Sequence, residues 1–216
     1  MHRPAMDTLN PYRNAPLSAA VRALCSAMTR PLREVLSRVP AGTSVLDYGA
    51  GDGQLAAWLA ARGRTVVAVE PDPRRIELGA ALHRGLPNLC FVRDLRAADA
   101  RGPFDVVLVV DVLYLVPRAE RAGLARRLAA LMAPSGRAVL KEVVASGIVR
   151  DTIVGVQERL VGLLTGCPPP VVDLPERREL DSLALVFGTI RESVDLPVAW
   201  YAHRLVVAGG TGGGRG

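Results

Sequence analysis

The sequence is poor in cysteine, and it contains no long apolar run. Its three cysteines, Cys25, Cys90 and Cys167, are odd in number and far apart. This pattern argues against a disulfide framework or a structural zinc site and suits a reducing cytoplasm. No apolar stretch approaches the roughly 20 residues that a membrane-spanning helix needs. The first residues, "MHRPAMDTLNPYRN", lack the apolar centre of a secretion signal, so we expect a cytoplasmic protein.

Lysine is almost absent, since Lys141 is the only lysine among 27 basic residues. The net charge of +6 is uneven: residues 1–40 contain six arginines against Asp7 and Glu34, a net of +4. Such a basic leading segment could face an anionic substrate, an acidic carrier protein or a nucleic acid. It could equally be a solvated helix face.

The 216 residues are enough for one large domain with a full core. After residue 40 the pattern alternates between strand-like and helix-like segments. The central strand-like segments are continuous apolar runs, as expected of strands that are covered on both faces. Strands are expected at 44–48, 65–70, 89–93, 104–110 and 136–144, and helices at 53–62, 72–84 and 117–132, the last followed by a turn at "APSG".

The pattern loosens after residue 145. Asp151 is expected to cap a helix that runs to Leu164, and a shorter helix is expected at 176–186. Two strand-like stretches follow, at 188–196 and 199–208. The connection between them is too short for a parallel crossover, so they should pair antiparallel.

This alternation predicts an α/β fold, with a doubly wound, mostly parallel sheet of seven strands and helices on both faces. Apolar residues at helical spacing over 17–38, interrupted at Pro31, indicate N-terminal helices that could form a lid. We expect a helical lid at 1–40, a core at 41–208 and a flexible glycine-rich tail at 209–216.

Three glycines, Gly49, Gly51 and Gly53, stand between the first strand and its helix in "VLDYGAGDG". Glycines at such a joint allow backbone amides and a helix N-terminus to approach a ligand closely. The spacing is G-x-G-x-G, and Gln54 stands where a dinucleotide-binding fingerprint has Gly or Ala. The loop is therefore of another kind.

The segment resembles the first motif of the class I S-adenosylmethionine (SAM)-dependent methyltransferases, and the chain is most similar to their metal-independent, small-molecule group. Four further segments are similar to the family's later motifs, in the right order: "VVAVEPDP", "FVRDLR", "FDVVLVVDVLYLVP" and "LAALMAPSGRAVLKEVV". Together they cover roughly residues 40–145. The resemblance implies a Rossmann-like methyltransferase fold, SAM as cofactor, S-adenosylhomocysteine (SAH) as product, and a bacterial biosynthetic role.

The resemblance also implies roles for three acidic residues. Glu70 would accept hydrogen bonds from both ribose hydroxyls, which suits a carboxylate at the end of a strand. Asp94 would lie near the adenine amino group, although Asp99 or Asp105 could serve instead. Asp47 would steady the loop or the methionine ammonium, unless it is simply a buried turn-former. The expected cofactor site comprises Tyr12, Arg13, Asp47, Gly49, Ala50, Gly51, Gly53, Glu70, Pro71, Asp94, Leu95 and Asp111.

Methyl transfer from a sulfonium needs mainly alignment and at most one base. The catalytic candidates are His203, Tyr114 and Asp111. Tyr114 stands where relatives often have histidine, and His203 could be a base or a core histidine bonded to backbone. Glu142 is a further candidate for the acceptor pocket, and His83, at a helix end, is expected at the surface. No Asp-Asn pair follows the fifth strand, so we expect no metal.

We expect a small-molecule acceptor, possibly anionic or bound to a carrier protein, and a monomer or homodimer. An RNA methyltransferase is an alternative that the basic leader favours. Against it, the chain has only nine aromatic residues and no "NPPY" segment after the fourth strand. A second alternative is a cyclase-like protein that binds SAM without transferring its methyl group.

Overall fold

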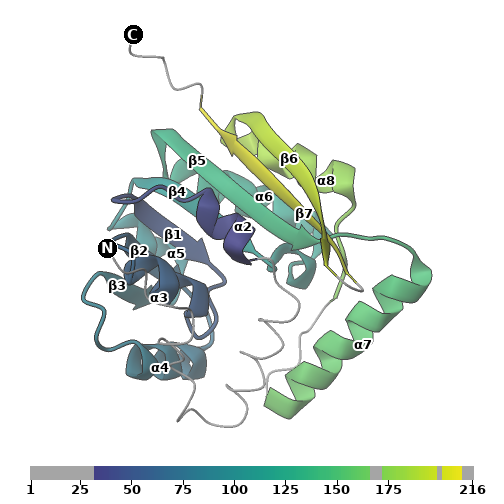
Figure 1. Cartoon of the computed structure of the whole chain (residues 1–216), viewed down its shortest axis with the longest axis horizontal. Helices are drawn as coiled ribbons and strands as arrows, with labels where there is room; N and C mark the ends of the chain where they lie inside the picture. The colour runs from purple at the N-terminus through teal and green to yellow at the C-terminus, as the bar shows by residue number, and fades with distance from the viewer. Residues whose placement is uncertain (1–31, 166–171, 199–200, 211–216) are drawn as a thin grey trace.

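A computed structural model describes residues 32–165, 172–198 and 201–210 of the chain. In these residues seven strands form one sheet in the order β3-β2-β1-β4-β5-β7-β6 (Figure 1). Neighbours among β1 to β5 pair parallel, whereas β7 runs antiparallel to both β5 and β6. The strands are β1 (Ser44–Tyr48), β2 (Thr65–Val69), β3 (Leu89–Val92), β4 (Phe104–Val110), β5 (Met132–Val143), β6 (Thr189–Val198) and β7 (Tyr201–Gly209). The predicted seven-stranded, mostly parallel sheet is confirmed.

Helices cover both faces of this sheet, as a doubly wound fold requires. On one face Val35 and Leu59 pack in the same cluster as Val66 of β2. On the other face Leu124 and Leu183 pack in the same cluster as β4 and β5 residues. The helices are α2 (Leu32–Ser37), α3 (Gln54–Ala60), α4 (Pro73–Leu82), α5 (Leu95–Asp99), α6 (Arg118–Ala130), α7 (Ile148–Thr165) and α8 (Arg177–Ala184), with 3-10 turns η3 (Leu113–Leu115) and η4 (Leu185–Phe187).

The expected turn at "APSG" is wrong, because residues 133–136 belong to β5, which begins at Met132. Met132 pairs with Phe104, and Arg137 is the next paired residue, opposite Val106. Five steps along β5 therefore match two along β4. The Pro, Ser and Gly residues form an irregularity within the strand instead of a turn before it.

Two helices also differ from expectation, one in its existence and one in where it starts. The five-residue helix α5 is not predicted by periodicity, which needs a longer segment to become visible. Asp151 does not precede α7 but lies in its first turn, where its Oδ1 accepts a hydrogen bond from the Ser146 amide. The carboxylate still satisfies a backbone donor at the helix start, although from inside the helix.

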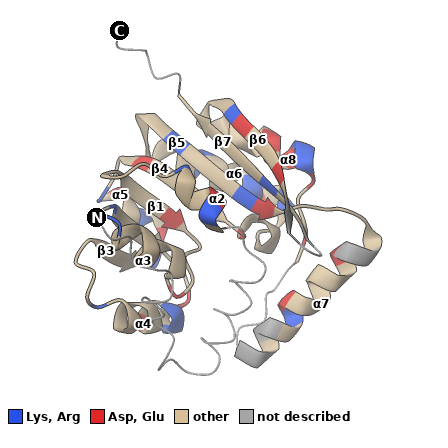
Figure 2. Cartoon of the chain, in the orientation of Figure 1, with Lys and Arg blue, Asp and Glu red and all other residues tan. Residues whose placement is uncertain are grey.

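The chain leaves the compact α/β layers in α7, which extends beyond the carboxyl end of β5 (Figure 1). Most of this helix is uncharged (Figure 2). It carries most of the exposed large apolar side chains of the described residues: Ile148, Ile153, Val156, Leu160 and Leu163. None of the described helices is long and apolar enough to cross a membrane. Of the expected lid, the described residues include helix α2, and residues 1–31 lie outside the described residues.

Candidate cofactor site

The loop between β1 and α3 is held against the end of β2. The amides of Gly49 and Ala50 both donate to the Val69 carbonyl, at 2.9 and 3.0 Å. Gly49, Gly51 and Gly53 have φ values of 76°, 62° and 79°. Side chains rarely adopt this left-handed conformation, so the shape of the loop itself requires glycine.

The three glycines differ in what surrounds their Cβ positions. A Cβ on Gly49 would lie 2.4 Å from Val112 Cγ2, and one on Gly53 would lie 2.3 Å from Phe91 Cζ. These two glycines make room for the protein's own side chains. A Cβ on Gly51 would have only Arg75 Nη1 near it, at 4.0 Å. The open face of the loop is therefore at Gly51.

Glu70 lies directly beside this open face. It follows the last residue of β2 and is 4% exposed. Its Oε2 accepts from the Gly51 amide at 2.8 Å, and its Oε1 accepts from the Asp72 amide at 3.0 Å. Each carboxylate oxygen has a second lone pair. A buried carboxylate next to bare main chain fits the ribose of a nucleoside cofactor.

Arg75, in the first turn of α4, was not singled out from the sequence. Its Nη1 lies 3.9 Å from Glu70 Oε2 and reaches over Gly51. The guanidinium thus places a positive charge at the open face. The sequence could have indicated Arg75. It lies in the first turn of the helix that follows Glu70, and that turn starts at the same edge of the sheet as Glu70.

Asp94 follows β3, which lies next to β2, so it is at the same edge of the sheet as Glu70. Its side chain is exposed and caps α5, where Oδ1 accepts from the Ala97 amide at 2.8 Å. Leu95 packs against the core and Pro71 is exposed, while Asp47 is buried in β1 at 3% exposure. The structure therefore gathers the predicted residues of the core around one edge.

Asp111 stands at the end of β4 in the left-handed conformation, with φ of 55°. The Lys141 Nζ donates to both of its carboxylate oxygens, at 2.7 and 2.8 Å, and both side chains are buried. Its amide donates to the Lys141 carbonyl, which continues the β4–β5 pairing. Asp111 thus serves as the counter-ion of a buried lysine.

Glu142 follows Lys141 on β5 and is fully buried. Its Oε1 accepts from the amides of Val112 and Leu113, at 2.9 and 3.0 Å. Burial, together with the nearby charge of Asp111, raises the pKa of Glu142 to about 8, although the two amides and Lys141 act in the opposite direction. Burial thus favours the protonated form of this carboxyl more than in an ordinary glutamate.

A family model of the methyltransferase domain matches residues 21–184, most of the chain. This chain belongs to the methyltransferase domain family. S-adenosylmethionine is the methyl donor of that family, and the expected family and cofactor are confirmed. The geometry at Gly51 and Glu70 suits this cofactor.

The methyltransferase is 33% identical over 136 residues to a ubiquinone biosynthesis O-methyltransferase of Methylocella silvestris, a match that covers 61% of this chain and 52% of the relative. It is 38% identical over 124 residues to a ribosomal RNA small subunit methyltransferase C of Chromohalobacter salexigens, covering 52% and 36%. The chain thus spans between about a third and a half of the length of these curated relatives.

The fold is similar to the crystal structure of a Burkholderia thailandensis 1,6-didemethyltoxoflavin-N1-methyltransferase, with a TM-score of 0.64 at 20% identity. That structure contains 1,6-didemethyltoxoflavin and S-adenosylhomocysteine. The similarity covers 96% of this chain and 92% of that one. At this level of identity it shows that the two folds agree.

The remaining candidates lie at the β4–β5–β7 side of the methyltransferase. His203 is 1% exposed on β7, opposite Val143 of β5. Tyr114 is 2% exposed in η3, and its carbonyl accepts from the Asp173 amide. Tyr12 and Arg13 lie outside the described residues. Within the described residues no group of three or more His, Cys, Asp or Glu side chains could hold a metal ion.

His83 corrects a further expectation, because it is not at the surface but 7% exposed. Its Nε2 lies 3.0 Å from the Asp52 carbonyl in the glycine loop. Burial lowers the pKa of His83, so the neutral ring is favoured. The histidine supports the loop from α4, and its position at a helix end did not indicate this.

Proposed function

We propose that this methyltransferase transfers the methyl group of SAM to a small-molecule acceptor. The observation that carries the cofactor half of the proposal is the buried carboxylate of Glu70 beside the open face of Gly51. Two relatives support the acceptor half. One is named as a ubiquinone biosynthesis O-methyltransferase. The other has 1,6-didemethyltoxoflavin bound, and the similarity covers nearly all of both chains.

When bound, SAM supplies a methyl group activated by the positive charge on its sulfur, so the protein has mainly to bind and orient. Glu70 has the free lone pairs to accept both ribose hydroxyls while it holds the Gly51 and Asp72 amides. Asp94 lies at the same edge of the sheet and would contact the adenine end, and Asp47, buried in β1 two residues before Gly49, would serve the loop or the methionine end. These assignments place the cofactor across the ends of β1, β2 and β3.

The acceptor would lie over the ends of β4 and β5, where Asp111, Tyr114 and His203 are the candidate catalytic residues. The Asp111 carboxylate is already engaged with Lys141. His203→Ala and Tyr114→Phe are therefore the informative variants for a proton acceptor. Residues 1–40 are proposed to cover this side as a lid.

The test is methyl transfer from SAM that is labelled in its methyl group. The acceptor is supplied either as an RNA-free metabolite extract or as total RNA. Label in the small-molecule fraction supports the proposal. Label in RNA would instead favour the second candidate, for which the ribosomal RNA methyltransferase relative is the supporting observation. Binding of SAM without label in either fraction would favour a cyclase-like protein, and the absence of binding to SAM and SAH would contradict the cofactor site itself.

A further inference from the structure

Three titratable side chains are buried together where β4 and β5 end. Lys141 and Glu142 are 0% exposed and Asp111 is 6% exposed. Lys141 balances the charge of Asp111, so Glu142 is an additional carboxyl with no cation of its own. Burying such a group costs free energy unless it is hydrogen-bonded. Glu142 therefore needs an explanation beyond packing.

The hydrogen bonds of Glu142 hold the loop that follows β4. The chain turns sharply at Asp111, which has a positive φ, and the next two amides have left the β4–β5 ladder. Glu142 Oε1 accepts from both of these amides, those of Val112 and Leu113. One side chain of β5 thus fixes the backbone of residues 112–113, which would otherwise have two buried donors to satisfy.

The loop that Glu142 holds presses against the glycine loop. A Cβ on Gly49 would lie 2.4 Å from Val112 Cγ2, so the Val112 side chain fills the space that Gly49 leaves. Gly49 in turn donates to the Val69 carbonyl, immediately before Glu70. A continuous series of contacts therefore connects Glu142 through Val112 to the cofactor edge.

We propose that Glu142 is a positioning residue of the cofactor site, which acts through Val112 to hold the glycine loop in its binding geometry. The proposal depends on the SAM site and not on the identity of the acceptor. The second carboxyl oxygen, Oε2, is buried and has no hydrogen-bond partner among the described residues. The two bonds to the loop are thus the polar contacts that the structure gives to this side chain.

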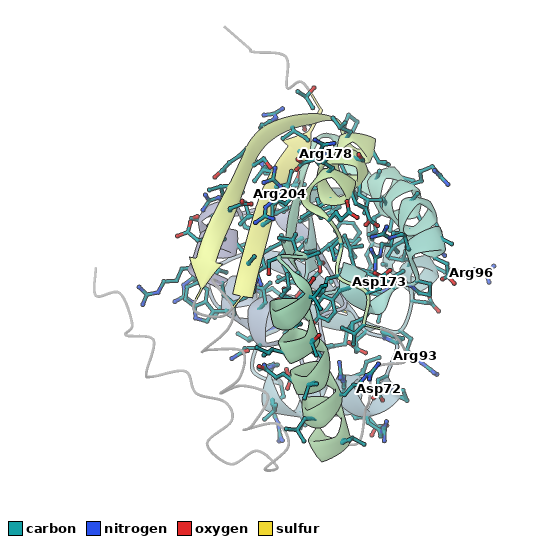
Figure 3. All side chains as sticks on the ribbon, turned by 90° about the vertical axis from the view of Figure 1, so that its right-hand side faces the viewer. Asp72, Arg93, Arg96, Asp173, Arg178 and Arg204 are labelled. Atoms are coloured by element: carbon teal, nitrogen blue, oxygen red, sulfur yellow. The ribbon has the colours of Figure 1, made fainter. Side chains whose placement is uncertain are left out.

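Other charged groups around Glu142 do not take over this role. Lysine and arginine side chains carry donors only and cannot accept from an amide, and the Asp111 carboxylate, which could accept, is engaged with Lys141. Arg204 is opposite Glu142 on β7, beside α8 (Figure 3), and its guanidinium bonds Asp181 and Asp195 at 2.8 and 2.9 Å. Removing Glu142 therefore leaves the Val112 and Leu113 amides without an obvious replacement acceptor.

The test is the dissociation constant of SAH for the full chain, measured by calorimetry beside the unfolding temperature. Glu142→Ala is expected to weaken SAH binding about tenfold, within the range for residues coupled through packing. Glu142→Gln is expected to recover most of that loss, since its amide oxygen can accept the same two bonds. Val112→Ala interrupts the series one step later and should also weaken binding, with a non-additive effect in the double variant.

The matched control is Asp105→Ala. Asp105 is the second residue of β4, at the amino end of that strand, so it does not lie near the adenine end, the alternative that the sequence left open. It is exposed and accepts from the Ser44 amide and hydroxyl, and its loss removes two hydrogen bonds at the end of the strands opposite to the cofactor site. It should lower the unfolding temperature and leave SAH affinity unchanged. An unchanged affinity in Glu142→Ala would overturn the proposal, and if that variant does not fold, unchanged affinity in Val112→Ala overturns it. If the wild-type protein does not bind SAH at all, that result contradicts the cofactor site itself.

Discussion

The carboxylate of Glu70 accepts a hydrogen bond from the Gly51 amide at 2.8 Å, which joins the end of β2 to the middle of the glycine loop. The other carboxylate oxygen accepts from Asp72 at the start of α4. Contacts within the protein therefore already orient the Glu70 carboxylate for a ribose. A preorganised acceptor of this kind loses little freedom on binding.

Glu70→Ala should weaken SAH binding by roughly 1.5–3 kcal/mol, the range for a hydrogen bond to a charged group. It should also destabilise the fold, because the Gly51 and Asp72 amides lose their acceptor. Calorimetric titration of SAH measures the first effect and thermal unfolding the second. Glu77→Ala, which removes an exposed carboxylate of α4, is the control and should change neither. An unchanged dissociation constant in Glu70→Ala would remove this residue from the site.

Gly51→Ala should abolish most SAH binding at a modest cost in stability. The methyl group meets no protein atom closer than Arg75 Nη1 at 4.0 Å, so the fold bears mainly the strain of positive φ, about 1–2 kcal/mol. Gly42→Ala is a matched control, because Gly42 has φ of 74° and nothing within 4 Å of its Cβ position. Both variants should lose similar unfolding free energy in urea, and only Gly51→Ala should lose affinity. Equal affinity in the two would show that the open face is not the binding face.

Glu142 should make the methyltransferase less stable as the pH rises toward 8. Its pKa is raised from 4.5 to about 8 in the folded protein, so the unfolded chain releases this proton first. Between these values each rise in pH should favour unfolding, and the effect should be absent well below pH 4.5 and constant above about 8. Urea unfolding of the wild type and Glu142→Gln at several pH values measures this, and the variant should show the flatter profile. Parallel profiles would contradict the raised pKa.

Asp94 combines a helix cap with a predicted role in binding adenine, and two substitutions separate them. Asp94→Ala should lose about 1 kcal/mol of stability, because the Ala97 amide loses its acceptor. Asp94→Ser should keep most of that stability, since serine caps helices well, while removing the carboxylate. If Asp94 contacts the adenine amino group, both variants should bind SAH several-fold more weakly. If Asp94→Ser binds SAH as tightly as the wild type, Asp94 caps the helix and does not bind adenine.

The sequence was most informative where one local rule determines the outcome. The run "FDVVLVV" predicted a strand buried on both faces, and β4 is such a strand. Glu70 could be placed at the cofactor edge because it directly follows an apolar strand of a parallel sheet. The sequence was less informative where local preference and tertiary pairing compete. The segment "APSG" favours a turn. Met132, which precedes it, nevertheless pairs with Phe104 of β4, so β5 begins before the segment and runs through it.

The contacts between segments could not be predicted from local patterns. Val112 fills the space beside Gly49 only because β1 and β4 pair in their particular register. Gly49 and Val112 are 63 positions apart in the chain. The burial of His83 likewise depends on α4 packing beside the glycine loop. The left-handed turn at Asp111 becomes understandable only with Lys141 and Glu142 placed on the neighbouring strand.

The strand order also has a consequence for folding. Among the described strands β7 comes last in the chain, yet it lies between β5 and β6 and pairs with both. Until β7 inserts, β5 has an unpaired edge and β6 has no strand to join. That edge is open to pairing with other chains while the sheet is incomplete, so the insertion of β7 both joins the last two strands to the sheet and closes the edge.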